Sequence, residues 1–149
     1  MSKAAVKDAF RIQAKACLAL GSTFTASLCQ SFHDNLTDQT AVGEFCLGWV
    51  GDPGPSANSI PLRLCGGFHA IVLSGLDEAL KEHYPPDQTV APQWLELERV
   101  LVEHEAYLLD WLTSPPQTNE VSRSGVLWPA MMEISRRTKL PLSLLEVGA

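Results

Sequence analysis

The chain has 149 residues, of which 46% are hydrophobic and 19% charged, and this composition fits a globular protein rather than a disordered one. The net charge is −6, and residues 76–110 contain nine acidic but only two basic side chains. A nucleic-acid partner is therefore disfavoured, because binding phosphates needs a concentrated basic surface. No apolar run approaches the roughly 18 residues that a membrane span needs, so a membrane partner is not expected either.

The N-terminus and the cysteines indicate a cytoplasmic protein. Residues 1–8 contain no apolar signal core. Cys17, Cys29, Cys46 and Cys65 include no Cys-x-x-Cys pair, which argues against a zinc site. Because each cysteine lies among apolar residues, we expect reduced thiols in the core.

Hydrophobic periodicity predicts six helical segments, of which three lie in the first third of the chain. The first spans about residues 3–20 and ends at Gly21. The second follows Ser22 as its N-cap, and the third begins near Asp38. The glycines and prolines of residues 51–56 then predict a loop.

The fourth segment is predicted to be the central helix of the bundle. It opens with Ser59 as its cap and Pro61 in its first turn. From Leu62 to Leu76 it is apolar nearly all round, which is typical of a buried helix. The Pro85-Pro86 pair ends this segment.

The remaining segments predict two helices and one strand. The fifth helix starts at Pro92 and ends near Leu112, and the sixth runs from Asn119 to about Thr138 with a kink or break at Pro129. Residues 140–149 form an apolar run followed by glycine, as in a buried parallel strand that enters a tight turn. We therefore predict a mainly α fold: a bundle of about six helices over residues 1–139, then the first strand of a truncated α/β domain, lacking its sheet.

Arg63 is the first candidate for ligand binding. It is the only ionised residue between Asp52 and Asp77, and it lies in the first turn of a helix, where the helix dipole disfavours a cation. An anionic small molecule could compensate its charge, and an internal ion pair is the alternative. His69, on the same helix, is a further candidate, although a histidine in that position is more often a core residue. His104, on the apolar seam of the fifth helix, is expected to be a core residue bonded to one partner.

The densest polar cluster lies at the start of the sixth helix. Free backbone N–H groups there could receive a carboxylate or phosphate, and a capped helix with a surface ion pair is the plain alternative. The candidate residues are Gln117, Thr118, Asn119, Glu120, Arg123 and Ser124. The sequence shows no convincing nucleophile–base pair, metal cluster or phosphate-binding loop, so we predict no catalytic residue and no metal ligand.

Three stretches, residues 61–69, 116–124 and 140–149, resemble a bacterial family catalogued as domain of unknown function 2332. The most specific part is the string Gln-Thr-Asn-Glu-Val-Ser-Arg-Ser at 117–124. Longer members of that family continue with α/β sequence similar to the first motif of S-adenosylmethionine-dependent methyltransferases, Glu-x-Gly-x-x-x-Gly. Glu146 and Gly148 match the start of this motif, and its last glycine is missing. The resemblance implies a helical N-terminal half, with S-adenosylmethionine as a cofactor of the longer members and none in this chain.

Two functions follow as hypotheses. In the first, the chain is a helical cap that shapes a substrate pocket over a methyltransferase-like domain, with Arg63 and residues 117–124 lining the pocket; alone it is not catalytically complete. In the second, the chain is a non-catalytic interaction or oligomerisation module. An apolar strand without a sheet exposes unpaired backbone groups, so we expect a homo-oligomer formed through the C-terminal segment.

Overall fold

A computed structural model describes residues 2–86, 88–116 and 120–145, and of residues 120–124 it describes the backbone alone. About two thirds of the chain is helical (64%), and none of the described residues forms a strand, which confirms the mainly α class. The chain divides into two compact units, residues 1–116 and 117–149. The predicted boundary after residue 139, between a helical domain and the first strand of an α/β domain, stays a prediction.

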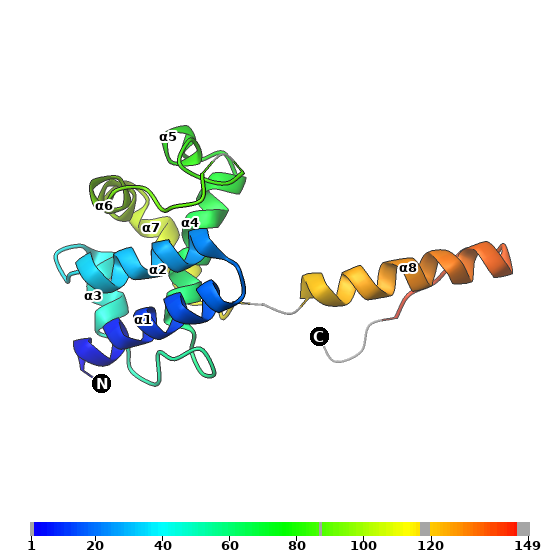
Figure 1. Cartoon of the computed structure of the whole chain (residues 1–149), viewed down its shortest axis with the longest axis horizontal. Coiled ribbons are helices and arrows are strands. Elements are labelled where there is room, and N and C mark those ends of the chain that lie inside the picture. Colours follow the sequence, from blue (N-terminus) through cyan, green and yellow to red (C-terminus); the bar gives the residue numbers. More distant parts are fainter. Residues whose placement is uncertain (1, 87, 117–119, 146–149) are drawn as a thin grey trace. The chain divides into compact units, whose positions relative to one another are not determined.

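The first unit begins with an antiparallel pair of helices. Helix α1 spans Lys3–Ala19 and α2 spans Thr23–Asn35; the two lie side by side, joined by the turn at Gly21, whose φ is +80° (Figure 1). The first helix is capped by Ser2, whose hydroxyl accepts from the Ala5 N–H group. This turn confirms the predicted end of the first helix, because glycine adopts a positive φ without steric cost.

Two further helices complete the centre of this unit. Helix α3 spans Ala41–Leu47 and its N-cap is Thr40, two residues beyond the predicted start at Asp38. Helix α4 spans Ile60–Leu73 and packs against α1 and α2, crossing behind them in Figure 1. Ser59 is its N-cap as predicted. Its hydroxyl, however, donates to the Pro55 carbonyl instead of accepting a hydrogen bond from a backbone N–H group of the helix.

The core gathers where α1, α2 and α4 meet. The rings of Phe10 and Phe32 are 5.7 Å apart between centroids, and those of Phe32 and Phe68 are 5.3 Å apart at a steep angle. All three side chains are fully buried, as are Leu64 and Ile71 on α4. The near-continuous apolar sequence of the central helix is thus explained by burial on most of its sides.

The predicted fifth helix is in fact two helices. Helix α6 spans Trp94–Glu103 and α7 spans Glu105–Leu112, and between them His104 has φ −109° and ψ 25°, outside the helical region. A short helix, α5, spans Glu78–Lys81 before them. Periodicity did not reveal the break because the apolar spacing stays in phase across it. The break coincides with a tertiary contact of the His104 side chain, which bonds Asp77.

The second unit contains helix α8, Glu120–Thr138, and the segment that returns along it (Figure 1). The helix continues across Pro129, so the break that this proline predicted does not occur. Residues 140–145 have no regular structure. That is expected for a single apolar segment without a neighbouring strand, since a strand gains its hydrogen bonds only in a sheet. Among the described parts, no helix is long and apolar enough to cross a bilayer.

Candidate functional site

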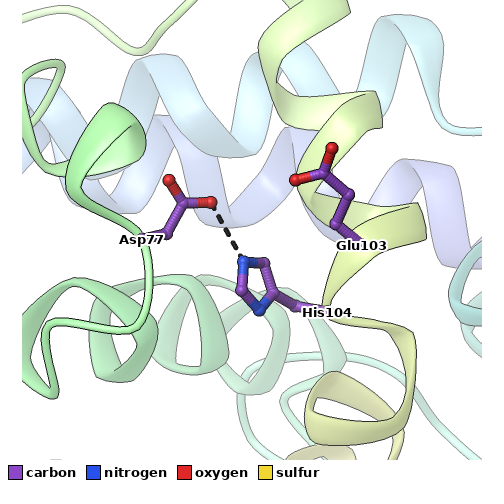
Figure 2. Close-up of side chains that lie close together, drawn as sticks. All are labelled: Asp77, Glu103 and His104. Carbon is purple, nitrogen blue, oxygen red and sulfur yellow. Dashed lines mark hydrogen bonds and ion pairs between the residues drawn. The ribbon is translucent and has the colours of Figure 1, made fainter.

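A polar cluster joins α5, α6 and the break before α7. Its centre is Asp77, the N-cap of α5, whose side chain is only 5% exposed. Arg99 on α6 and His104 at the helix break both point toward this carboxylate. Figure 2 shows Asp77 and His104 facing each other, with Glu103, the last residue of α6, nearby.

Each oxygen of the Asp77 carboxylate has partners. Oδ1 accepts from the Leu80 backbone N–H group at 2.9 Å. Oδ2 lies 2.8 Å from Nη2 of Arg99 and 3.0 Å from Nε2 of His104. Arg99 also donates to the carboxylates of Glu96 and Glu103 on its own helix, at positions i−3 and i+4. One guanidinium therefore holds three carboxylates together.

The protonation of the cluster follows from these contacts. Burial by itself raises the pKa of Asp77, but the hydrogen bonds from Leu80, Arg99 and His104 outweigh it, so the pKa lies below its ordinary value. The hydrogen bond from Arg99 likewise lowers the pKa of Glu96. The hydrogen bond to Glu96, and those to Asp77 and Glu103, raise the pKa of Arg99, so the guanidinium keeps its charge.

Asp77, Glu103 and His104 could also offer ligand atoms to a metal ion, because one atom of each lies within 4.8 Å of the others. The Oδ2 atom of Asp77, however, already binds the Arg99 guanidinium. A divalent ion would have to displace this permanent cation against charge repulsion. The arrangement is therefore explained as an ion network that fixes α5 and α6 to the helix break.

Sequence reasoning found only part of this cluster. His104 bonds one partner, Asp77, as expected, but its side chain is half-buried instead of lying in the core. Asp77 and Arg99 were not singled out. The available signal was that Arg99 is one of only two bases in the acidic stretch 76–110 and has glutamates at helical spacing on both sides.

Arg63 is buried, with 6% of its surface exposed, as its isolation in an apolar helix predicted. Its Nε group donates to the Asn58 carbonyl at 2.6 Å, and Nη1 donates to the carbonyls of Leu112 and Thr113 at 3.0 and 3.1 Å. The guanidinium also lies 5.3 Å from the Trp49 ring centroid. Its charge is thus met by the carbonyl end of α7, where the helix dipole is negative.

His69 occupies a different environment from the one expected. Its side chain is exposed and stacks against Tyr84, with ring centroids 6.1 Å apart, rather than lying in the core. It lies six positions after Arg63, which is about 9 Å along the helix axis at ~1.5 Å per residue. The two candidates therefore do not form one site. Gln117, Thr118, Asn119, Glu120, Arg123, Ser124, Glu146 and Gly148 lie outside the described side chains.

A second feature of note is the apolar groove of unit 117–149. It is formed by α8 and the segment returning along it, and is lined mainly by Trp128, Met131, Met132, Leu142 and Leu144. Within this unit Trp128 is 64% exposed and Leu144 is 70% exposed. A contiguous patch of a large ring and several aliphatic chains facing water is uncommon on the surface of a monomeric domain and is typical of an interface.

The described residues are thus mainly helical, with an ion network at α5 and α6 in the first unit and an apolar groove in the second. Residues 7–149 match the model of a family described as an uncharacterized protein conserved in bacteria, DUF2332, and the chain belongs to that family. No curated protein and no solved structure matches the chain.

Proposed function

We propose that this chain is a non-catalytic helical domain whose second unit, α8 with residues 139–145, is the surface that docks onto an α/β domain of methyltransferase type. The observation that carries the proposal is the apolar groove with its exposed Trp128 and Leu144. The α/β assignment rests on the similarity of residues 140–149 to the first methyltransferase motif.

The energetics of the groove support a docking role. Burying a large apolar side chain stabilises a complex by about 1.5–3 kcal/mol relative to leaving it in water. Several such side chains share this groove, among them Trp128, Met132 and Leu142. A covering sheet would bury them and would offer backbone hydrogen-bond partners to residues 141–145.

The polar residues of unit 1–116 support a structural role in place of a catalytic one. Arg63 donates its hydrogen bonds to backbone carbonyls. The Asp77 carboxylate accepts hydrogen bonds from Arg99, His104 and Leu80. Neither group has a nucleophile beside it among the contacts of the described residues.

Light scattering of the purified chain tests the docking surface. In the purified sample no α/β partner covers the groove. A second copy of the chain should then cover it, so the chain should self-associate at micromolar concentration. The double variant Trp128→Ser/Leu144→Ser should shift the population toward monomer. Leu20→Ser, at a residue 85% exposed in the other unit, is the matched control and should leave association unchanged. A monomer of 16.2 kDa at all concentrations would contradict the docking proposal.

Binding of S-adenosylmethionine tests the non-catalytic part. Of the first methyltransferase motif the sequence contains only Glu146 and Gly148. Calorimetric titration should therefore detect no tight binding. A dissociation constant near 10 μM, about −7 kcal/mol of binding free energy, would contradict this part of the proposal.

A further inference from the structure

Three of the four cysteines converge from three different helices. Cys17 lies on α1, Cys29 on α2 and Cys65 on α4. The Sγ atoms of Cys29 and Cys65 are 3.6 Å apart, in van der Waals contact. All three cysteines are free thiols, and Cys46 is buried as well.

The distance between Cys29 and Cys65 is close to that of a bond. A disulfide has its sulfur atoms about 2.05 Å apart, so forming the bond requires the pair to close by roughly 1.5 Å through side-chain rotation and adjustment of the two helices. The two residues are 36 positions apart in the chain and lie on helices that pack together. A bond between them would join α2 covalently to the central helix.

We propose that Cys29 and Cys65 form a redox-sensitive staple, a reversible disulfide that locks α2 onto α4 when the protein meets a peroxide. The inference is independent of the docking function proposed above. It rests on the contact between the two sulfur atoms and on the burial of both side chains.

The chemistry proceeds in two balanced steps. The Cys65 thiol attacks hydrogen peroxide, which gives a sulfenic acid and releases one water molecule. The Cys29 thiol then attacks this sulfur, an S–S bond forms, and the hydroxyl group leaves as a second water molecule with the proton from Cys29. Overall, two thiols are oxidised and one peroxide is reduced to two water molecules.

Burial decides the order and the speed of these steps. Cys17 and Cys65 each keep 6% of their surface exposed, whereas Cys29 has none, so a small oxidant reaches these two before Cys29. Of the two, Cys65 is the one whose sulfur atom lies 3.6 Å from that of Cys29. The hydrogen bond with Cys17 lowers the pKa of Cys29, but the hydrogen bond with Cys65 and burial outweigh it, so the pKa lies above its ordinary value and the reactive thiolate form is scarce. The staple should therefore form slowly and only under sustained oxidation, while Cys29 is already positioned to resolve the sulfenic acid.

Peptide mapping of the intact chain after peroxide treatment is the test. The folded protein is incubated with hydrogen peroxide, its remaining thiols are alkylated after denaturation, and the digest is read by mass spectrometry. We expect one disulfide that joins the peptides of Cys29 and Cys65, with Cys17 and Cys46 alkylated. Four alkylated cysteines, or a bond between Cys17 and Cys29, would overturn the assignment.

Thermal melting supplies a second readout with matched variants. Closing the loop should raise the melting temperature by about 5–10 °C, and dithiothreitol should reverse the rise. Cys46→Ala, which changes an equally buried cysteine outside the pair, should keep the peroxide-induced rise, and Cys65→Ala should lose it. The same rise in both variants would refute the staple. Should Cys65→Ala fail to fold, the peptide map of the unmodified chain decides alone.

Discussion

Arg63 illustrates how a buried cation is held without a carboxylate. Its partners are three backbone carbonyls, two of them at the C-terminal end of α7, and the face of Trp49. This contact joins the first turn of α4 to the last turn of α7. The sequence indicated that Arg63 needs compensation, but it could not show which groups supply it, because carbonyl groups are present at every residue and leave no signal in the pattern.

Replacing Arg63 by Met should therefore destabilise the domain. The carbonyls of Asn58, Leu112 and Thr113 would lose a charged donor, and the bond to Leu112 lies where the surroundings are buried. We expect a loss of about 2–4 kcal/mol in the free energy of unfolding, measured by urea denaturation. Arg11→Met, at a half-buried arginine whose side chain pairs with Asp8, should change it by less than about 1 kcal/mol. Equal effects of the two substitutions would contradict the role assigned to Arg63.

Asp77 should make the stability depend on pH. Its pKa is lower in the folded chain than in the unfolded chain, so its contribution is complete above the unfolded pKa of about 4 and is lost as the pH falls through the folded value. Asp77→Asn should lower the free energy of unfolding by about 1–3 kcal/mol at neutral pH, and the difference from the unmodified chain should shrink in acid.

Urea denaturation at a series of pH values measures this dependence. Asp110→Asn, at an exposed position, is the control and should leave the pH profile unchanged. The difference in the free energy of unfolding between Asp77→Asn and the unmodified chain could instead stay constant from neutral pH to well below the unfolded pKa. That result would show that the charge of the carboxylate does not contribute to stability.

At the scale of helices, the close approach of α4 and α7 depends on Gly67. A Cβ atom at this position would lie 2.8 Å from Cδ2 of the fully buried Leu108 and 3.3 Å from Cδ1 of Trp111. Gly67→Val should therefore lower the free energy of unfolding by about 1–3 kcal/mol through overpacking. Ala70→Val, on the same helix at a half-buried position, should cost less than about 1 kcal/mol. Thermal or urea unfolding that ranks the two variants in the opposite order would contradict this packing.

The helices themselves were largely predictable because apolar spacing and breakers are local signals. Gly21 and the proline-rich loop of residues 51–56 separated elements correctly. The break at His104 was not predictable, since it depends on a bond to Asp77, 27 residues away in the chain. The ion network could not be assembled from sequence for the same reason: Arg99 has two local partners but its decisive one, Asp77, comes from another element.

At the scale of the whole molecule, the mainly α class followed from the number of periodic segments, whereas the groove did not. The apolar run at residues 140–145 was recognisable as a segment that needs partners. That it returns along α8 and shares a groove with Trp128 and Met132 depends on the turn after Thr138, where Lys139 has φ +58°. A lysine in this left-handed conformation is not signalled by sequence, since glycine or asparagine is usual there.

The docking surface is the central claim, and hydrogen exchange at two protein concentrations tests it most directly. If a second copy covers the groove, backbone amides of residues 126–138 and the segment 140–145 should exchange more slowly at high concentration than at low concentration. Amides of the buried helix α4 serve as the internal control and should exchange at the same rate in both samples. Exchange in α8 that is fast and independent of concentration, in a chain that remains monomeric, would contradict the account.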